Sequence, residues 1–171
     1  MKKKILIGIG MVAFLFIAQA GFAQDFEIGG TFMHYSSIGT NSASLVGGGL
    51  NIGATTYFGD TVGMGAYGNI LYAPYNSLVS VMVFDILLGV SFMIVDNEYF
   101  SLPFSFGAYF EDFYAFSPIA TREGFNIGVG GNLTGKFKVS EAVKVYLRFQ
   151  AAYTFLGGGE VFITPSIGLA F

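Results

Sequence analysis

The chain of 171 residues contains no cysteine, no tryptophan, a single histidine, four prolines and few charged residues. Without cysteine it cannot form a disulfide framework, a thiolate zinc site or a cysteine nucleophile. Charged residues make up 11% of the chain, against about 25% in an average soluble protein. Apolar residues make up 53%, and because intrinsic disorder needs low hydrophobicity and high charge, disorder is excluded.

Long hydrophobic runs are also missing beyond residue 23, where no stretch of 18 consecutive apolar residues occurs. A helical membrane protein with several spans needs about 20 apolar residues for each of them, so that class is excluded. What the chain does have is 25 glycines and 20 phenylalanines. This composition indicates an all-β protein in which large apolar residues alternate with small or polar ones.

The first 23 residues have the parts of a secretory signal peptide. A basic segment, Lys2–Lys4, precedes an apolar core, Ile5–Ala18. Two pairs of small residues suit a cleavage site, Ala18 with Ala20 and Gly21 with Ala23, and we favour cleavage after Ala23. At about 1.5 Å per residue the core would span about 21 Å as a helix, too short for a ~30 Å hydrocarbon layer. We therefore expect residues 1–23 to be a cleavable signal peptide and residues 24–171 to be the mature domain.

The mature chain carries a negative charge. Without the three N-terminal lysines, five basic residues face eleven acidic ones, which gives a net charge of −6. Nucleic-acid binding depends on neutralising phosphates with Lys and Arg, so this balance excludes nucleic acid as a partner.

Apolar residues recur at every second position through eight segments of the mature chain. In residues 100–107, for example, the even positions are Phe or Leu and the odd positions are Ser, Pro or Gly. This period of two predicts β-strands. The segments are residues 26–32, 50–55, 62–72, 82–94, 100–107, 125–137, 143–154 and 161–171.

The polar faces of these segments carry too few charges to coat a soluble surface, but their Gly, Ser, Thr and Asn residues suit a narrow interior. The apolar faces would then meet lipid, where a sheet must close because an open edge has no hydrogen-bond partners. An even strand number is typical of bacterial single-chain barrels. The sequence therefore predicts an eight-stranded antiparallel up-and-down transmembrane β-barrel.

The connections alternate between short and longer segments, as such a barrel requires. We expect short periplasmic turns at Gly59–Thr61, Asp96–Glu98 and Ser140–Ala142, and outer loops at residues 36–44, 73–77, 112–123 and 156–160. Aromatic residues near both ends of the strands, Tyr57 among them, predict the two girdles of a membrane barrel. At Pro103 and Pro165 we expect a bulge or a missing ladder bond, because proline has no backbone N–H.

The end of the chain, ITPSIGLAF, places Ile167, Leu169 and Phe171 at alternate positions. This ending resembles the C-terminal signal that the barrel-assembly machinery recognises in bacterial outer-membrane barrels. The whole mature chain resembles a small barrel protein of the OmpA/OmpX/OmpW type. The resemblance implies a monomeric, integral protein in the outer membrane of a Gram-negative-type envelope, surrounded by its lipid. The outer loops are shorter than those of OmpX-like adhesins, which makes a host-binding role less favoured.

Charged side chains at inward positions are the first candidate site. Charges in a narrow interior are costly unless they pair, and we expect Arg148 to pair with Asp85. Such a network would either plug the barrel or act as a gate or selectivity ring for a small solute. The residues of this predicted network are Glu27, Asp85, Glu111, Lys136, Lys144 and Arg148.

Apolar side chains at inward positions near the outer mouth are the second candidate site. Ten inward glycines predict an interior with little side-chain volume below that mouth. The arrangement resembles the hydrophobic pocket of OmpW-type barrels and implies a small apolar ligand. The residues of this predicted pocket are Met33, Leu45, Leu71, Val83, Tyr109 and Phe162.

Catalytic chemistry has only a weak candidate. His34 and Ser36 resemble the H-x-S arrangement of PagL-type lipid A deacylases, in which a carboxylate such as Glu111 would orient the histidine. A G-x-G-x-x-G match at residues 63–68 has no helix after it and is not a nucleotide site. We therefore predict a protein without catalytic residues, metal or cofactor, which is structural or binds or passes a small molecule. A surface-interaction protein and a lipid A hydrolase are the alternatives.

Overall fold

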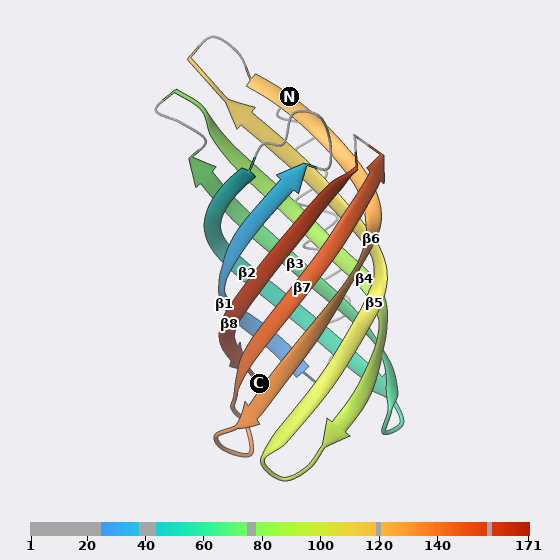
Figure 1. The fold of residues 1–171 in the computed structure, drawn as a ribbon. Coiled ribbons are helices and arrows are strands. Elements are labelled where there is room, and N and C mark those ends of the chain that lie inside the picture. Colours follow the sequence, from blue (N-terminus) through green and yellow to red (C-terminus); the bar gives the residue numbers. More distant parts are fainter. Residues whose placement is uncertain (1–24, 38–43, 75–77, 119–120, 157–158) are drawn as a thin grey trace.

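The computed structural model describes residues 25–37, 44–74, 78–118, 121–156 and 159–171. These residues form eight strands, each antiparallel to the next, and the first pairs with the last to close a barrel (Figure 1). The predicted fold class is confirmed. The strands are β1 (Asp25–Ser37), β2 (Ser44–Phe58), β3 (Val62–Pro74), β4 (Ser80–Asp96), β5 (Phe100–Phe116), β6 (Thr121–Lys138), β7 (Lys144–Leu156) and β8 (Glu160–Ala170).

The alternation in the sequence separates two surfaces of the barrel wall. On β5, Phe104 is 37% exposed on the outer surface, whereas its neighbour Ser105 is fully buried in the interior. Most of the exposed large side chains are apolar, while the interior contains buried Asn, Thr, Ser, Gln and charged residues. Because this is the reverse of a soluble protein, the wall is suited to a lipid surrounding.

Local sequence accounts for the three short turns at one end of the barrel, which we name the inner end. Gly59 has φ = 84° in the turn between β2 and β3, a conformation that glycine adopts without steric cost. Asn97 accepts hydrogen bonds from the backbone N–H groups of Tyr99 and Phe100 through its side-chain oxygen, both at 2.9 Å. Ser140 accepts one from the backbone N–H of Val143 at 3.1 Å. These contacts reverse the chain within few residues.

Closure between β1 and β8 reaches the last residue of the chain. The backbone N–H of Phe171 donates to the carbonyl of Phe26 at 2.8 Å, and the N–H of Phe26 donates in return at 3.1 Å. The ladder between the two strands has a gap beside Pro165, since the pairing runs from Thr31 with Ser166 directly to His34 with Ile163. The Thr31 hydroxyl donates to the carbonyl of Pro165 at 3.2 Å.

The other strand proline also interrupts its ladder. Pairing between β5 and β6 is absent at Leu102 and Pro103, and the register between β4 and β5 shifts at Met93 and Val95, opposite that point. The prediction of a bulge or a missing ladder bond at Pro103 and Pro165 is therefore confirmed. A closed barrel has no edge strand that could hold these prolines, so the wall itself has to deform.

The outer ends of two strands differ from the sequence prediction. Residues 112–116 and 121–123 were expected to belong to a loop, but they continue β5 and β6 as a paired hairpin. These are among the longest strands, with 17 and 18 residues, and their hairpin extends furthest at the outer end in the view of Figure 1. The polar residues of this segment suggested a loop. They belong to the strands because cross-strand pairing continues without a break up to Phe116 and Thr121.

Aromatic side chains occur near both ends of the wall. Phe58, Tyr99 and Phe137 are exposed on the outer surface at the inner end, and Tyr153 and Phe155 are exposed towards the outer end. Tyr57 was expected in the inner girdle but is buried, because it falls on the inward-facing parity of β2. Among the described residues, no helix has the length and apolarity needed to span a membrane. The expected signal peptide, residues 1–23, lies outside the described residues.

Substitution of Phe106 by Arg tests which face meets lipid. Phe106 lies between the two aromatic girdles and is 54% exposed. We expect this change to lower the free energy of unfolding by about 2–4 kcal/mol in lipid vesicles, because a charge on the lipid face is most costly at mid-depth. Phe58→Arg, at the inner end of β2, should cost about 0–1 kcal/mol. Equal losses in urea titrations of the two variants would contradict this placement.

Candidate functional site in the barrel interior

An ion-pair network occupies the inner half of the interior. Glu27 pairs with Lys136 at 2.7 Å through one carboxylate oxygen and with Arg148 through the other. Lys136 also contacts Asp25 at 2.9 Å, and Asp25 in turn pairs with Lys144. Except for Lys144 at the inner mouth, all of these side chains are almost completely buried. Two carboxylates and three cations from β1, β6 and β7 thus join the walls of the barrel.

The Arg148 guanidinium lies at the centre of the inner half. It stacks over the ring of Tyr67 at 4.3 Å and lies 5.2 Å from the ring of Tyr146, while its Nε donates to Thr134 at 3.2 Å. The Tyr146 hydroxyl donates to the side chain of Asn51. Cation–π contacts of a desolvated guanidinium stabilise a structure by about 2 kcal/mol. The aromatic rings therefore fix the cation against the opposite walls.

Hydroxyl groups extend this polar packing on the far side of Tyr67. The Tyr67 hydroxyl lies 2.9 Å from the hydroxyls of both Thr55 and Ser105, and Ser105 lies 2.7 Å from Ser91. All four side chains are buried. This cluster joins β2, β3, β4 and β5 and shares Tyr67 with the ion-pair network, so the inner half is packed across its whole width.

Inward glycines make room for these large side chains. A Cβ atom added at Gly53 would lie 2.9 Å from the Glu27 carboxylate and 3.0 Å from the Arg148 guanidinium. At Gly65 it would lie 2.6 Å from the ring of Tyr67. The prediction of an interior with spare volume is wrong for this half, because arginine and tyrosine side chains fill the space that the glycines leave.

The pairing within the charged set also differs from the prediction. Arg148 was expected to pair with Asp85, but its partner is Glu27. Asp85 instead accepts hydrogen bonds from Asn69 at 2.7 Å and from Gln150 at 3.4 Å, both through Oδ1. The predicted single network is thus divided between the two halves of the barrel. Asp25 was missed, although extending the alternation by one step from Glu27 would have placed it on the inward face.

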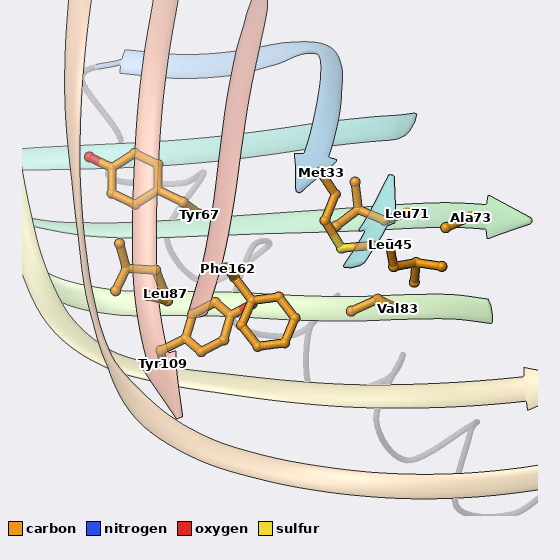
Figure 2. Close-up of a cluster of buried hydrophobic side chains, with 10 residues drawn as sticks. Met33, Leu45, Tyr67, Leu71, Ala73, Val83, Leu87, Tyr109 and Phe162 are labelled. Atoms are coloured by element: carbon orange, nitrogen blue, oxygen red, sulfur yellow. The ribbon is translucent and has the colours of Figure 1, made fainter. Parts of the chain in front are cut away.

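The outer half of the interior contains a buried apolar cluster. Tyr109 and Phe162 lie with their ring centroids 5.8 Å apart, and Val83, Leu71 and Met33 line the opposite part of the same cluster (Figure 2). All six residues of the predicted pocket belong to it. The cluster comprises Met33, Leu45, Tyr67, Leu71, Ala73, Val83, Leu87, Tyr109, Ala152 and Phe162, with Val81 and Phe113 packed against it.

Two carboxylates lie within this apolar half. Asp85 on β4 and Glu111 on β5 are directly opposite each other in the register and are 1% and 2% exposed. Asn126 donates to Glu111 at 3.2 Å and to Glu160 at 3.0 Å. The outer half therefore combines apolar side chains with carboxylates whose hydrogen-bond donors are neutral amides.

The predicted contact between His34 and Glu111 does not form. His34 is exposed on the outer surface of β1, whereas Glu111 is buried in the interior, so the barrel wall separates the two side chains. The side chain of Ser36 lies outside the described part of the structure. Residues 63–68 are part of β3. Within the described ranges, no group of three His, Cys, Asp or Glu side chains is placed to hold a metal ion.

The comparison with solved structures supports this architecture. No protein-family model and no curated protein sequence matches the chain. Solved structures do match over most of their length. Neisserial surface protein A has a TM-score of 0.70 at 11% identity, covering 85% of this chain and 94% of its own. The fold is that of an eight-stranded outer-membrane barrel.

Two further structures support this fold. Ail, the attachment invasion locus protein of Yersinia pestis, has a TM-score of 0.60 at 16% identity and covers 86% of this chain and 97% of its own. The outer membrane protein OprG from Pseudomonas aeruginosa has a TM-score of 0.59 at 15% identity, covering 86% and 95%. At such low identities the likeness concerns the backbone. The interior side chains of this outer-membrane barrel have to be interpreted from its own structure.

Replacement of Glu27 by Gln tests the stabilising role of the ion-pair network. Removing one partner of a buried pair leaves an uncompensated charge and costs about 3–5 kcal/mol. Asp96→Asn is the matched control, because the Lys138–Asp96 pair at 2.8 Å is 27% and 53% exposed and should contribute less than about 1 kcal/mol. Urea unfolding in vesicles measures both values, and similar small losses would show that water reaches Glu27.

The same two variants test whether the network closes the barrel. We expect liposomes with the wild-type protein or Asp96→Asn to release little of a small solute, and those with Glu27→Gln to release more. High flux through the wild-type barrel would contradict closure at the inner half.

Proposed function

We propose that this protein is a non-enzymatic barrel of the outer membrane that binds a small apolar molecule in the outer half of its interior. The observation that carries the proposal is the buried apolar cluster around Tyr109 and Phe162, inside a barrel whose other inward residues are mostly polar. Ligand sites are typically lined by apolar and aromatic side chains with a few polar groups among them. Asp85 and Glu111 are such groups.

The inner half closes the proposed site on one side. Asp25, Glu27, Lys136 and Arg148 lie between the apolar cluster and the inner end, so a ligand entering from the outer end meets charged, paired side chains. Passage through the barrel would require these pairs to separate. The proposal is therefore binding at the outer half, with the network acting as a gate for any onward movement.

A surface-interaction role is the second candidate. The paired extension of β5 and β6 to Phe116 and Thr121 supports it, because the two strands present a paired hairpin at the outer end where a loop was expected. A protein of this kind needs no ligand in its interior. Saturable binding of an apolar molecule inside the barrel would therefore favour the first candidate.

Export and assembly complete the proposal. Residues 1–23 act as the signal peptide, and Ile167, Leu169 and Phe171, all exposed on the outer surface of β8 and its end, act as the assembly signal. The side chain of Phe171 is free to be recognised because its barrel-closing contacts are made by its backbone.

Substitution of Phe171 by Lys separates recognition from closure. We expect the Phe171→Lys protein to cross the inner membrane but fail to reach the outer membrane as a heat-modifiable barrel, since it keeps the backbone groups that pair with Phe26. Val139→Lys, an exposed position in the turn after β6, is the control. Normal membrane assembly of Phe171→Lys would refute the role of this side chain.

A tryptophan reporter tests ligand binding, because the natural chain contains no tryptophan. In Phe162→Trp the indole lies in the apolar cluster, and in Phe149→Trp it lies on the outer surface. We expect a brominated aromatic such as bromobenzene to quench Phe162→Trp saturably in detergent. It should quench Phe149→Trp in proportion to its partitioning into the micelle. Non-saturating quenching of both reporters would contradict an interior site.

A further inference from the structure

Asp85 and Glu111, in the outer half, form no salt bridge with any side chain that the structure describes. Asp85 on β4 and Glu111 on β5 are directly opposite each other in the register of these neighbouring strands. Like charges at such positions destabilise a sheet. Each has one oxygen that accepts from an amide and one, Asp85 Oδ2 or Glu111 Oε2, with no hydrogen-bond partner. A buried carboxylate in this state is stabilised either by taking up a proton or by a cation that binds to it.

The cations of the mature chain whose side chains the structure describes are engaged elsewhere. Lys136, Lys144 and Arg148 pair with Glu27 and Asp25 in the inner half, and Lys138 pairs with Asp96 at the inner end. Within the described residues neither Asp85 nor Glu111 forms a salt bridge. Arg122, the remaining basic residue of the mature chain, is paired in the β5–β6 register with Ala115, two inward positions beyond Glu111.

Two neutral side chains independently point to a ligand that donates hydrogen bonds. Gln150, whose amide nitrogen donates to Asp85, has an unpartnered Oε1, and Thr154 has an unpartnered Oγ1. They are 2% and 0% exposed. Thr154 lies opposite Glu160, which shares the amide of Asn126 with Glu111. Buried oxygens without donors are thus present on β4, β5 and β7 of the same half, and an ammonium group carries three donors and no acceptor.

Apolar side chains lie directly above and below the two carboxylates. Val83 and Leu87 flank Asp85 on the inward face of β4, and Tyr109 and Phe113 flank Glu111 on β5. Figure 2 shows Val83, Leu87 and Tyr109 within one cluster that also contains the ring of Phe162. A bound cation would therefore meet aromatic rings as well as carboxylates, and its organic part would meet the apolar layers.

We propose that the outer half of the barrel selects an organic amine, whose ammonium group binds between Asp85 and Glu111 and whose apolar part packs in the surrounding cluster. This inference rests on the proposed function and narrows its ligand class from apolar molecules to apolar cations. A neutral alcohol of the same shape would bring one hydrogen-bond donor to these unpartnered oxygens, whereas the ammonium group brings three and a positive charge. The site therefore prefers the amine.

Calorimetric titration of the folded mature protein with two probes of similar shape tests this selection. In neutral detergent, with empty micelles as the blank, we expect 2-phenylethylammonium to bind about tenfold more tightly than 2-phenylethanol, the ratio produced by about 1.4 kcal/mol. Asp85→Asn and Glu111→Gln should remove this preference. Both replacements retain side-chain size and leave no new buried charge, so the barrel should still fold, which heat modifiability verifies.

Asp112→Asn is the matched control, because Asp112 follows Glu111 on the opposite face of β5 and accepts a hydrogen bond from Tyr114 at 2.6 Å. This variant should keep the preference for the amine. Equal binding of the two probes to the wild-type protein would overturn the cation site and leave apolar binding intact. Loss of the preference in Asp112→Asn, or its retention in both interior variants, would also overturn it. Absence of binding by either probe would overturn the proposed function as well.

Discussion

The backbone hydrogen-bond requirement of a sheet in lipid is the constraint on which the rest of this molecule depends. Every strand needs a partner on both sides, so β1 must pair with β8, and eight strands then enclose a narrow interior. The polar side chains alternate with the lipid-facing ones along each strand, so they must point into this interior. Charges, hydroxyls and aromatic rings are therefore crowded inside the wall because the barrel closes. The ion pairs and hydrogen bonds among them offset the cost of burying them.

The two halves of the interior solve the problem of buried charge differently. In the inner half, carboxylates and cations are interleaved, and glycines such as Gly53 give Arg148 and Glu27 the space to meet. In the outer half, Asp85 and Glu111 are solvated by amides and surrounded by apolar side chains. The first arrangement places a layer of paired charges across the inner half. The arrangement in the outer half leaves one oxygen of each carboxylate without a hydrogen-bond donor. The proposed ligand site depends on these oxygens.

The sequence was sufficient for the wall but not for contacts across the interior. Because side chains alternate strictly along a strand, parity alone placed Phe104 outside, Ser105 inside and all six apolar pocket residues in one cluster. It could not pair Arg148 with Glu27, since that depends on the tilt and stagger of β1 relative to β7. The continuation of β5 through residues 112–116 was missed for a related reason, because polar residues there are stabilised by pairing with β6.

The interrupted ladder beside Pro165 gives the barrel wall an uneven mechanical strength. Between Thr31 and His34 the β1–β8 register skips Phe32 and Met33, and a threonine hydroxyl takes over the carbonyl of Pro165. Met33 is also part of the apolar cluster, so this interrupted seam borders the outer half of the interior. A sheet opens locally where the fewest backbone hydrogen bonds have to break. The apolar cluster thus adjoins an interrupted backbone ladder on one side and the ion-pair network below. Opening the wall beside this cluster breaks fewer backbone hydrogen bonds than opening a fully paired seam.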